Sequence, residues 1–392
     1  MISAGKVCEV PAPYTCNCLL AGSAILFCGQ FDVVVGCYQL NDCAHNPTIN
    51  TYRGSVYGLV CGQGSSDALV PYTHFPKLDI GPDPFPGIFD LIVADGGHSL
   101  LATCTDGSVR LLRFEEGLYK HSMFHVSDTM VTSCSPLYGS CGSGAAMCKW
   151  LCTAHLGSVV FYDACSETVV MKLEGHDYDA WCSASGSQDT ALTGGDDGAM
   201  KWWDTRAGCK SVGKMRFDAG VVSISPVTEC NTATTTYALV GSYDEKLYLV
   251  DSRCNKGPLS SIALGGGVWR CSRQMLEEEL SSDARGAMHC NRWVQRRNAL
   301  AVPVMQGGVA LVRYDVTAPS GQNFAFLGHL HQSSAATGNV HLPPNALFYD
   351  CAVIPKDLCQ VKTSKSTINL ATCDFYNKVV SLWEVDGVKS SD

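Results

Sequence analysis

Hydrophobic and polar positions along the chain follow one short pattern that occurs seven times. Each copy has an apolar strand, a tight turn and a second strand in which apolar and polar residues alternate, which is typical of a half-buried β-hairpin. The stretch LTGGDDGAMKWWD shows the pattern most clearly. The copies lie at 49–60, 101–114, 151–163, 192–204, 239–251, 302–315 and 370–384.

A constant spacing inside the copies indicates that they are repeats of one unit. In five copies an acidic residue follows the turn residue by seven positions, a spacing that unrelated hairpins in a sandwich have no reason to share. The turns are about 40 to 70 residues apart, near the four-strand period of a propeller blade. The pairs are Leu156 and Asp163, Asp197 and Asp204, Asp244 and Asp251, Gly308 and Asp315, and Asn377 and Glu384.

The repeats predict an all-β chain that forms a seven-bladed WD-repeat β-propeller, one domain over 1–392. We expect the N-terminal strand to close the last blade. The main departure from strand patterning is RQMLEEELSSDARGAMH (273–289), whose apolar spacing and acidic residues predict a short surface helix. We assign it to an insertion in the sixth blade, at about 271–297.

Charge and cysteine content narrow the class of protein. Charged residues make up 17% of the 392 residues and the net charge is −9, which argues against nucleic-acid binding and favours a positively charged partner. The 22 cysteines form no CxxC pair and scatter through apolar runs, as free thiols do in a reducing compartment. No run has the length of a membrane span, and 18–28 is a poor signal peptide. We therefore expect a cytoplasmic protein that does not bind membranes.

The two aspartates of GGDDG receive different roles. In WD-repeat blades the turn aspartate bonds a histidine of the preceding loop, and a strand Ser or Thr and a tryptophan complete the set. Asp197, His176, Thr193 and Trp203 stand at suitable positions and are predicted to be structural. Asp196 precedes the turn residue, at a position that looks out of one face around the central channel.

The position before the turn predicts a ring of residues on that face. Three tyrosines, a histidine and an acid would make the ring chemically active, although ordinary exposed polar residues remain the alternative. Its predicted members are Tyr52, Thr105, His155, Asp196, Tyr243, Gly307 and Tyr376.

Five ordered motifs resemble the WD-repeat diphthine methylesterases of diphthamide biosynthesis. They are GHDYDAW (175–181), TGGDDGAMKWWDTR (193–206), VGSYDEKLYLVDSR (240–253), LGGGVWR (264–270) and LATCDFYNKVVSLWE (370–384). The resemblance implies hydrolysis of the methyl ester of methylated diphthine on elongation factor 2, without a metal or other cofactor. Other diphthamide biosynthesis proteins are further candidate partners. Where the family has a Met–His–Gly run, this chain has Met305, Gln306 and Gly307.

Several side chains are candidates for the chemistry of ester hydrolysis. Water activated by His155 or by Asp196 is the simpler route, because the chain has no G-x-S-x-G nucleophile motif. Cys373 is an alternative thiol nucleophile if an imidazole lowers its pKa. Arg270 could stabilise the charge that develops on the ester carbonyl oxygen.

The substrate implied by the resemblance carries a trimethylammonium group, which favours aromatic walls. Tyr243, Trp269 and Tyr376 are the predicted wall, and Asp196 and Asp244 the predicted negative field. A non-catalytic WD-repeat interaction scaffold is the main alternative, because fold alone does not establish chemistry. A carbonyl or amide hydrolase acting on another protein side chain is a second one.

Overall fold

The structure is a computed structural model and describes most of the chain. The predicted helix at 273–289, and nearly all of the predicted insertion, lie outside the described residues. The described ranges are 3–21, 32–40, 52–63, 69–72, 85–94, 99–115, 118–137, 149–186, 190–204, 206–228, 235–254, 256–271, 297–330, 342–354 and 368–386.

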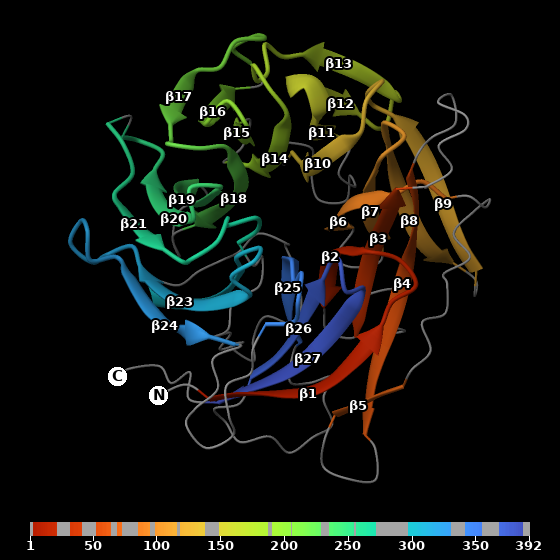
Figure 1. Cartoon of the computed structure of the whole chain (residues 1–392). Helices are drawn as coiled ribbons and strands as arrows, with labels where there is room; N and C mark the ends of the chain where they lie inside the picture. Colours follow the sequence, from red (N-terminus) through yellow and green to blue (C-terminus); the bar gives the residue numbers. More distant parts are fainter. Residues whose placement is uncertain are drawn as a thin grey trace, which may run out of the picture.

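Seven antiparallel sheets stand around a central axis, so the predicted seven-bladed propeller is confirmed (Figure 1). Blade 1 has β2 (Cys16–Ala21), β3 (Val33–Leu40), β4 (Tyr52–Gln63) and β5 (Leu69–Tyr72), from the axis outwards. Blade 2 has β6 (Ile88–Ala94), β7 (Ser99–Cys104), β8 (Ser108–Glu115) and β9 (Leu118–His125). Blade 3 has β10 (Val131–Pro136), β11 (Lys149–Ala154), β12 (Val159–Asp163) and β13 (Thr168–Lys172).

The second half of the ring repeats this arrangement. Blade 4 has β14 (Ala180–Ser185), β15 (Thr190–Gly195), β16 (Ala199–Asp204) and β17 (Gly213–Arg216). Blade 5 has β18 (Val221–Thr228), β19 (Thr235–Ser242), β20 (Lys246–Asp251) and β21 (Ser260–Ala263). Three strands of blade 6 are described, β22 (Arg297–Pro303), β23 (Val309–Asp315) and β24 (Phe324–His329).

The N-terminal strand closes the ring, as the sequence predicted. Blade 7 combines β25 (Phe348–Ile354), β26 (Ile368–Asp374) and β27 (Val379–Asp386) with β1 (Ser3–Pro11). β1 pairs antiparallel with β27 from Ser3 opposite Asp386 to Pro11 opposite Val379. The two ends of the described chain therefore lie in one sheet.

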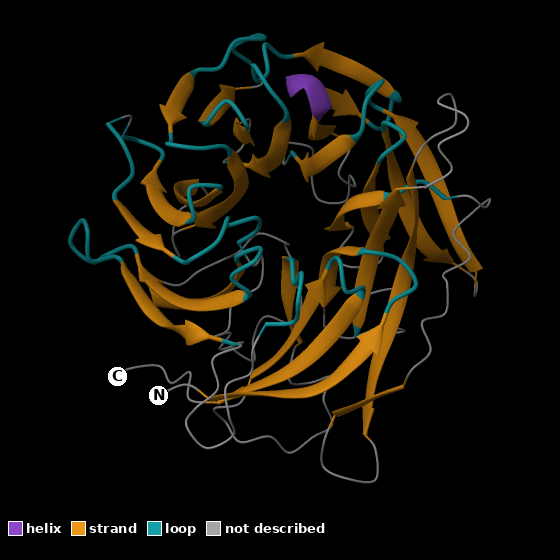
Figure 2. Ribbon diagram, viewed as in Figure 1, coloured by secondary structure: helices purple, strands orange, loops and turns teal. Residues whose placement is uncertain are grey.

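Apolar faces of neighbouring blades pack against each other and form the core. Between blades 2 and 3, for example, Leu101 and Val109 join one cluster with Trp150 and Tyr162. Consecutive residues of the inner strands, such as all six of β7 and of β10, are buried, so each sheet packs both of its faces against neighbouring blades. The main helical element of the described chain is the single 3₁₀ turn η2 (His155–Gly157), drawn in purple in Figure 2.

The predicted structural set of blade 4 is present as a chain of hydrogen bonds. His176 Nδ1 lies 2.8 Å from Asp197 Oδ1, and its Nε2 lies 2.8 Å from Thr193 Oγ1. Trp203 Nε1 donates to the same Thr193 oxygen at 2.8 Å. Burial raises the pKa of Asp197, but the hydrogen bond and charge of His176, together with the backbone N–H groups of Ala199 and Asp177, outweigh it and lower the pKa to about 2.

A bulge recurs at the second residue of the innermost strand in six blades. The strand pairing skips this residue each time, which turns its side chain away from the regular alternation. The bulge lies at the end of the strand that meets the turn face of the propeller. The skipped residues are Asn17, Phe89, Thr132, Trp181, Val222 and Tyr349.

Candidate functional site

One repeated backbone hydrogen bond identifies the ring position in the structure. Its donor is the N–H of the ring residue, and its acceptor is the carbonyl of the residue before the blade's innermost strand. For Asp196 the acceptor is Asp179, at 2.9 Å. The donors in six blades are Tyr38, Thr105, His155, Asp196, Tyr243 and Phe375.

By this hydrogen bond the predicted ring position is right in four blades and wrong in blades 1 and 7. In blade 7 the ring residue is Phe375, and Tyr376 beside it is 62% exposed. In blade 6 the turn packs Met305, not Gly307, against the aromatic cluster at the axis. In blade 1 the position belongs to Tyr38 at the end of β3, because the predicted copy with Tyr52 is β4, one strand further out.

Aromatic side chains cover the mouth of the channel. Phe89, Trp181, Trp269 and Tyr349 form what we call the aromatic floor. The ring centroids of Trp181 and Trp269 are 5.5 Å apart, and those of Trp269 and Tyr349 are 4.8 Å apart. Phe89 lies 5.9 Å from Trp181 and 6.3 Å from Trp269. The floor thus joins blades 2, 4 and 7 to the segment between β21 and β22.

Asp196 lies at the edge of the floor and is held by it. Trp181 Nε1 donates to Asp196 Oδ1 at 2.6 Å, although the carboxylate remains exposed. Lost hydration raises the pKa of Asp196, and the charges of Asp179 and Asp197 add to the rise against the effect of the Trp181 bond. Burial, and then the charge of Asp196, raise the pKa of Tyr243, whose ring lies 5.8 Å from that of Trp269.

His155 lies on the other side of Trp181, with a carboxylate behind it. Its Nδ1 is 3.4 Å from Asp179 Oδ2, and its ring meets the Trp181 ring edge-on at 5.3 Å. Asp179 Oδ1 also accepts the backbone N–H of Leu156 at 2.7 Å. His155 Nε2 is covered from solvent and has no hydrogen-bond partner in the described part of the chain. Asp179 can therefore orient the imidazole, whose Nε2 is covered.

Two predicted catalytic residues lie where they have other partners. Cys373 is fully buried in β26, its Sγ donates to the Asp350 carbonyl at 3.5 Å, and burial raises its pKa well above the ordinary thiol value. The geometry gives no support to a thiolate nucleophile there. Arg270 is occupied by a salt bridge to Asp90 at 2.5 Å, so its predicted contact with an ester oxygen also lacks support.

The predicted binding residues divide between the floor and the blade framework. Trp269 is part of the floor and Tyr243 packs on it. Asp244 accepts hydrogen bonds from Tyr248 Oη and the Lys246 N–H, which is the position of a turn aspartate within its own blade. Tyr376 is exposed beside Phe375, so its contact with a substrate stays a prediction.

A cavity lies in the channel under the floor. Its volume is about 60 Å³, which holds a few water molecules but not a modified amino-acid side chain. Trp181 and Trp269 cover it, and Ser133, Ser183 and Arg270 line it. The cavity itself is therefore a poor candidate for a substrate site.

Sequence reasoning missed Asp179, Trp181, Phe89 and Tyr349. Asp179 and Trp181 belong to GHDYDAW, a motif that we used for the resemblance but not for the site. Trp181, Phe89 and Tyr349 each occupy the second position of an innermost strand. Aligning these strands on each other, rather than the hairpins outside them, would have found the floor.

The structure bears on metal binding and on membrane crossing only within the described ranges. In the described ranges, no group of three or more His, Cys, Asp and Glu side chains is arranged to hold a metal ion. The same residues include no helix with the length and apolar character that crossing a bilayer requires.

The blade architecture and its hydrogen-bonded His–Asp–Thr–Trp set define the chain as a WD-repeat propeller. A chain in the crystal structure of the mitotic checkpoint complex shares the fold, with a TM-score of 0.59 and 12% identity over 97% of this chain and 92% of that chain. No protein-family model matches the sequence.

Curated relatives share part of the sequence. Diphthine methyltransferase of Homo sapiens is 32% identical over 192 residues, which is 44% of this chain and 41% of that protein. The Schizosaccharomyces pombe protein of that name is 32% identical over 36% of this chain and 43% of its own length. The Dictyostelium discoideum homolog is 25% identical over 60% of this chain and 59% of its own length. The chain thus spans less than two thirds of each relative, and the predicted resemblance to these diphthine-modifying proteins is confirmed.

Proposed function

We propose that the protein hydrolyses the methyl ester of methylated diphthine on elongation factor 2, a step of diphthamide biosynthesis in the cytoplasm. The observation that carries the proposal is the aromatic floor with Asp196 bonded to Trp181 at its edge. A trimethylammonium group binds over aromatic faces, with about 0.5–2 kcal/mol for each good contact. The carboxylate adds attraction for the same charge.

The reaction needs one water molecule and one proton acceptor. The acceptor takes a proton from water as its oxygen attacks the ester carbonyl, and the tetrahedral intermediate then expels the methoxy group. The leaving group takes up the proton, so the products are methanol and the free acid, which ionises at neutral pH. We assign the acceptor to Asp196, because its carboxylate is exposed and its pKa is raised, whereas His155 Nε2 is covered.

His155 then has a supporting role in the proposed reaction. Its ring packs edge-on against Trp181, and Asp179 fixes it from behind. It keeps Trp181 in place for both the ammonium group and Asp196. A small shift of Trp181 that lets water reach Nε2 would allow His155 to act as the base instead.

The names of the relatives favour a second candidate, transfer of a methyl group to diphthine. This reaction runs in the opposite chemical sense, since it forms a methyl ester from a carboxylate and a methyl donor. The same aromatic floor and Asp196 would suit either substrate, because both carry the trimethylammonium group. The direction therefore has to be measured.

One experiment separates these candidates. Purified protein is mixed with elongation factor 2 carrying either methylated diphthine or diphthine, with and without S-adenosylmethionine, and the modified peptide is followed by mass spectrometry. We expect loss of one methyl group without the donor, and a rate roughly 10²–10⁴-fold lower for Asp196→Asn. Asp204→Asn, which changes a carboxylate bonded to Arg206 away from the channel, is the matched control.

Each other outcome has a definite meaning. Gain of a methyl group only with the donor would establish methyl transfer and overturn the proposal. If folded protein neither removes nor adds a methyl group, the non-catalytic interaction scaffold becomes the better interpretation. If Asp196→Asn reacts at the full rate and His155→Ala reacts slowly, the general base is the His155 imidazole.

A further inference from the structure

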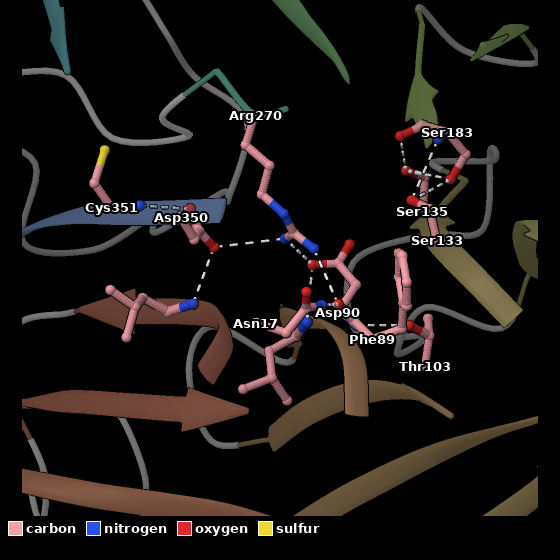
Figure 3. Close-up of polar contacts among 12 residues, drawn as sticks. Asn17, Phe89, Asp90, Thr103, Ser133, Ser135, Ser183, Arg270, Asp350 and Cys351 are labelled. Carbon is pink, nitrogen blue, oxygen red and sulfur yellow. Dashed lines mark hydrogen bonds and ion pairs between the residues drawn. The ribbon is translucent and has the colours of Figure 1, made fainter. Parts of the chain in front are cut away.

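A buried ion-pair triad lies directly under the aromatic floor. Arg270 Nη1 is 2.5 Å from Asp90 Oδ1 and 3.5 Å from Asp350 Oδ2, and Figure 3 shows the Arg270 side chain reaching between the two carboxylates. The side chains are 14%, 3% and 9% exposed, respectively. They come from β6, β25 and the segment before β22. The triad therefore links parts of the chain on different sides of the channel.

Each member of the triad directly follows an aromatic residue of the floor. The three neighbouring pairs are Phe89–Asp90, Trp269–Arg270 and Tyr349–Asp350. In β6 and β25 the aromatic residue is the bulge residue and the aspartate resumes the strand pairing. Holding the charged residue thus holds the backbone from which its aromatic neighbour projects.

Further hydrogen bonds fix the triad and connect it to the floor. Arg270 Nη2 donates to the carbonyl of Phe89 at 3.0 Å, so one guanidinium touches the backbone of a floor residue directly. Asp350 accepts the backbone N–H groups of Leu19 and Cys351, both at 2.9 Å. Buried polar networks of this kind are rigid, because breaking one bond leaves a buried group without its partner.

We propose that Asp90, Arg270 and Asp350 are positioning residues that hold the buried Phe89 and Trp269, which are 4% and 6% exposed, and with them the partly exposed Tyr349 and Trp181, in place for a quaternary ammonium ligand. The choice of ligand class rests on the proposed function. Attraction between a cation and an aromatic face requires the cation to lie within about 6 Å of the ring centroid, and each further ring within that distance adds to it. A triad that locks three inner segments together keeps those faces in register although the segments are far apart in sequence.

The test measures binding of tetramethylammonium chloride to the whole chain by tryptophan fluorescence, against sodium chloride at equal concentration. We expect wild-type protein to bind it, and Asp350→Asn to raise the Kd at least about tenfold. Arg270→Lys should raise the Kd similarly, since an ammonium group retains the charge but cannot span both carboxylates and the Phe89 carbonyl. Asp204→Asn, with its arginine partner on an exposed edge, should leave the Kd unchanged.

Thermal unfolding of each variant separates positioning from general stability. A triad with only a structural role would lower the melting temperature and leave the Kd of the folded protein unchanged, which would overturn the proposal. If Asp350→Asn weakens tetramethylammonium binding and Arg270→Lys does not, the effect is due to charge alone, and this would also overturn the proposal. So would wild-type protein that does not bind tetramethylammonium.

The result is distinguishable from a failure of the proposed function. If tetramethylammonium binds and depends on the triad, but no methyl ester is hydrolysed, the inference stands and the hydrolase proposal falls. If the ester is hydrolysed and tetramethylammonium does not compete, the hydrolase proposal stands and the triad loses its assigned ligand.

Discussion

The neighbouring aspartates of blade 4 have different roles, because Asp197 stabilises the blade and Asp196 lies at the proposed site. The Asp197 carboxylate is 2% exposed and bonded to His176, whereas Asp196 is exposed and bonded to Trp181 at the site. A bulge at the second residue of β14 makes this possible, because it brings Trp181 to the mouth of the channel. Adjacent residues of similar chemistry thus face different environments.

Substituting the two aspartates should give opposite results. We expect Asp197→Ala to lower the free energy of unfolding by about 1–3 kcal/mol, because it leaves buried His176 without its partner. Asp196→Ala should change the melting temperature little and weaken tetramethylammonium binding and turnover. Chemical denaturation and binding titrations on both variants measure the two effects. A large stability loss for Asp196→Ala with intact binding would reverse the assignment.

The stabilising effect of the buried Asp197 carboxylate should also depend on pH. The pKa of Asp197 is about 2 in the folded protein, below its ordinary value of 3.8, so its ionised form stabilises the fold above the unfolded pKa. That contribution, about 2 kcal/mol, is lost as the pH falls from 5 to 2. Unfolding free energies measured across this range should show a shallower acid slope in Asp197→Asn. Equal slopes in the two proteins would contradict the prediction.

At the scale of elements, the loop before β18 supports the site. A methyl group on Gly220 would lie 2.8 Å from Asp196 Oδ1, closer than side chains tolerate, and within tight contact of Tyr243 Cδ2 at 3.0 Å and Asp196 Cα at 3.2 Å. Asp196 is exposed and Tyr243 is only half-buried, so we expect small shifts at the site to absorb the methyl group and the fold to survive. Their movement would disturb the edge of the aromatic floor.

Gly220→Ala should therefore reduce activity more than stability. We expect turnover to fall about ten- to a hundredfold, because small displacements of catalytic groups have large effects. Gly213→Ala is a suitable control, since its new methyl group would lie 3.4 Å from Trp202, an ordinary contact. Rates and melting temperatures of both variants decide the question. A Gly220→Ala enzyme as active as the control would show that the loop does not constrain the site.

The hairpin repeats predicted the ring position only where it keeps a constant distance from the end of the second hairpin strand. In blades 3, 4 and 5, counting back from the acidic residue after the turn finds His155, Asp196 and Tyr243. In blades 6 and 7 Met305 and Phe375 lie ten and nine residues, not eight, before the acidic residues Asp315 and Glu384. The same count then misses by one or two residues, because extra residues between the two positions leave the strand pattern unchanged.

At the scale of the whole molecule, ring closure creates contacts that no local pattern contains. The blade number follows from the repeats, because each blade is one local unit of sequence. The triad does not, since Arg270 is 180 residues from Asp90 in the chain. An aromatic residue followed by a charged one is a common dipeptide, and these three pairs do not recur at a regular spacing in the sequence. Only closure brings these residues together and assembles the floor above them.

The N-terminal strand β1 provides this closure, so its removal should affect both stability and the floor. β1 covers the edge of β27, and Val10 is 1% exposed in a core cluster shared with blades 1 and 7. Deleting residues 1–11 removes those hydrogen bonds and apolar contacts, and should lower the free energy of unfolding by at least about 3 kcal/mol. The bare β27 edge should also promote association between chains. Replacing Glu9 by alanine, which removes only its exposed ion pair with Lys6, should cost no more than about 1 kcal/mol. Denaturation and light scattering measure both effects. A shortened chain that remained monomeric, with full-length stability and tetramethylammonium affinity, would show that the six other blades hold the floor without closure.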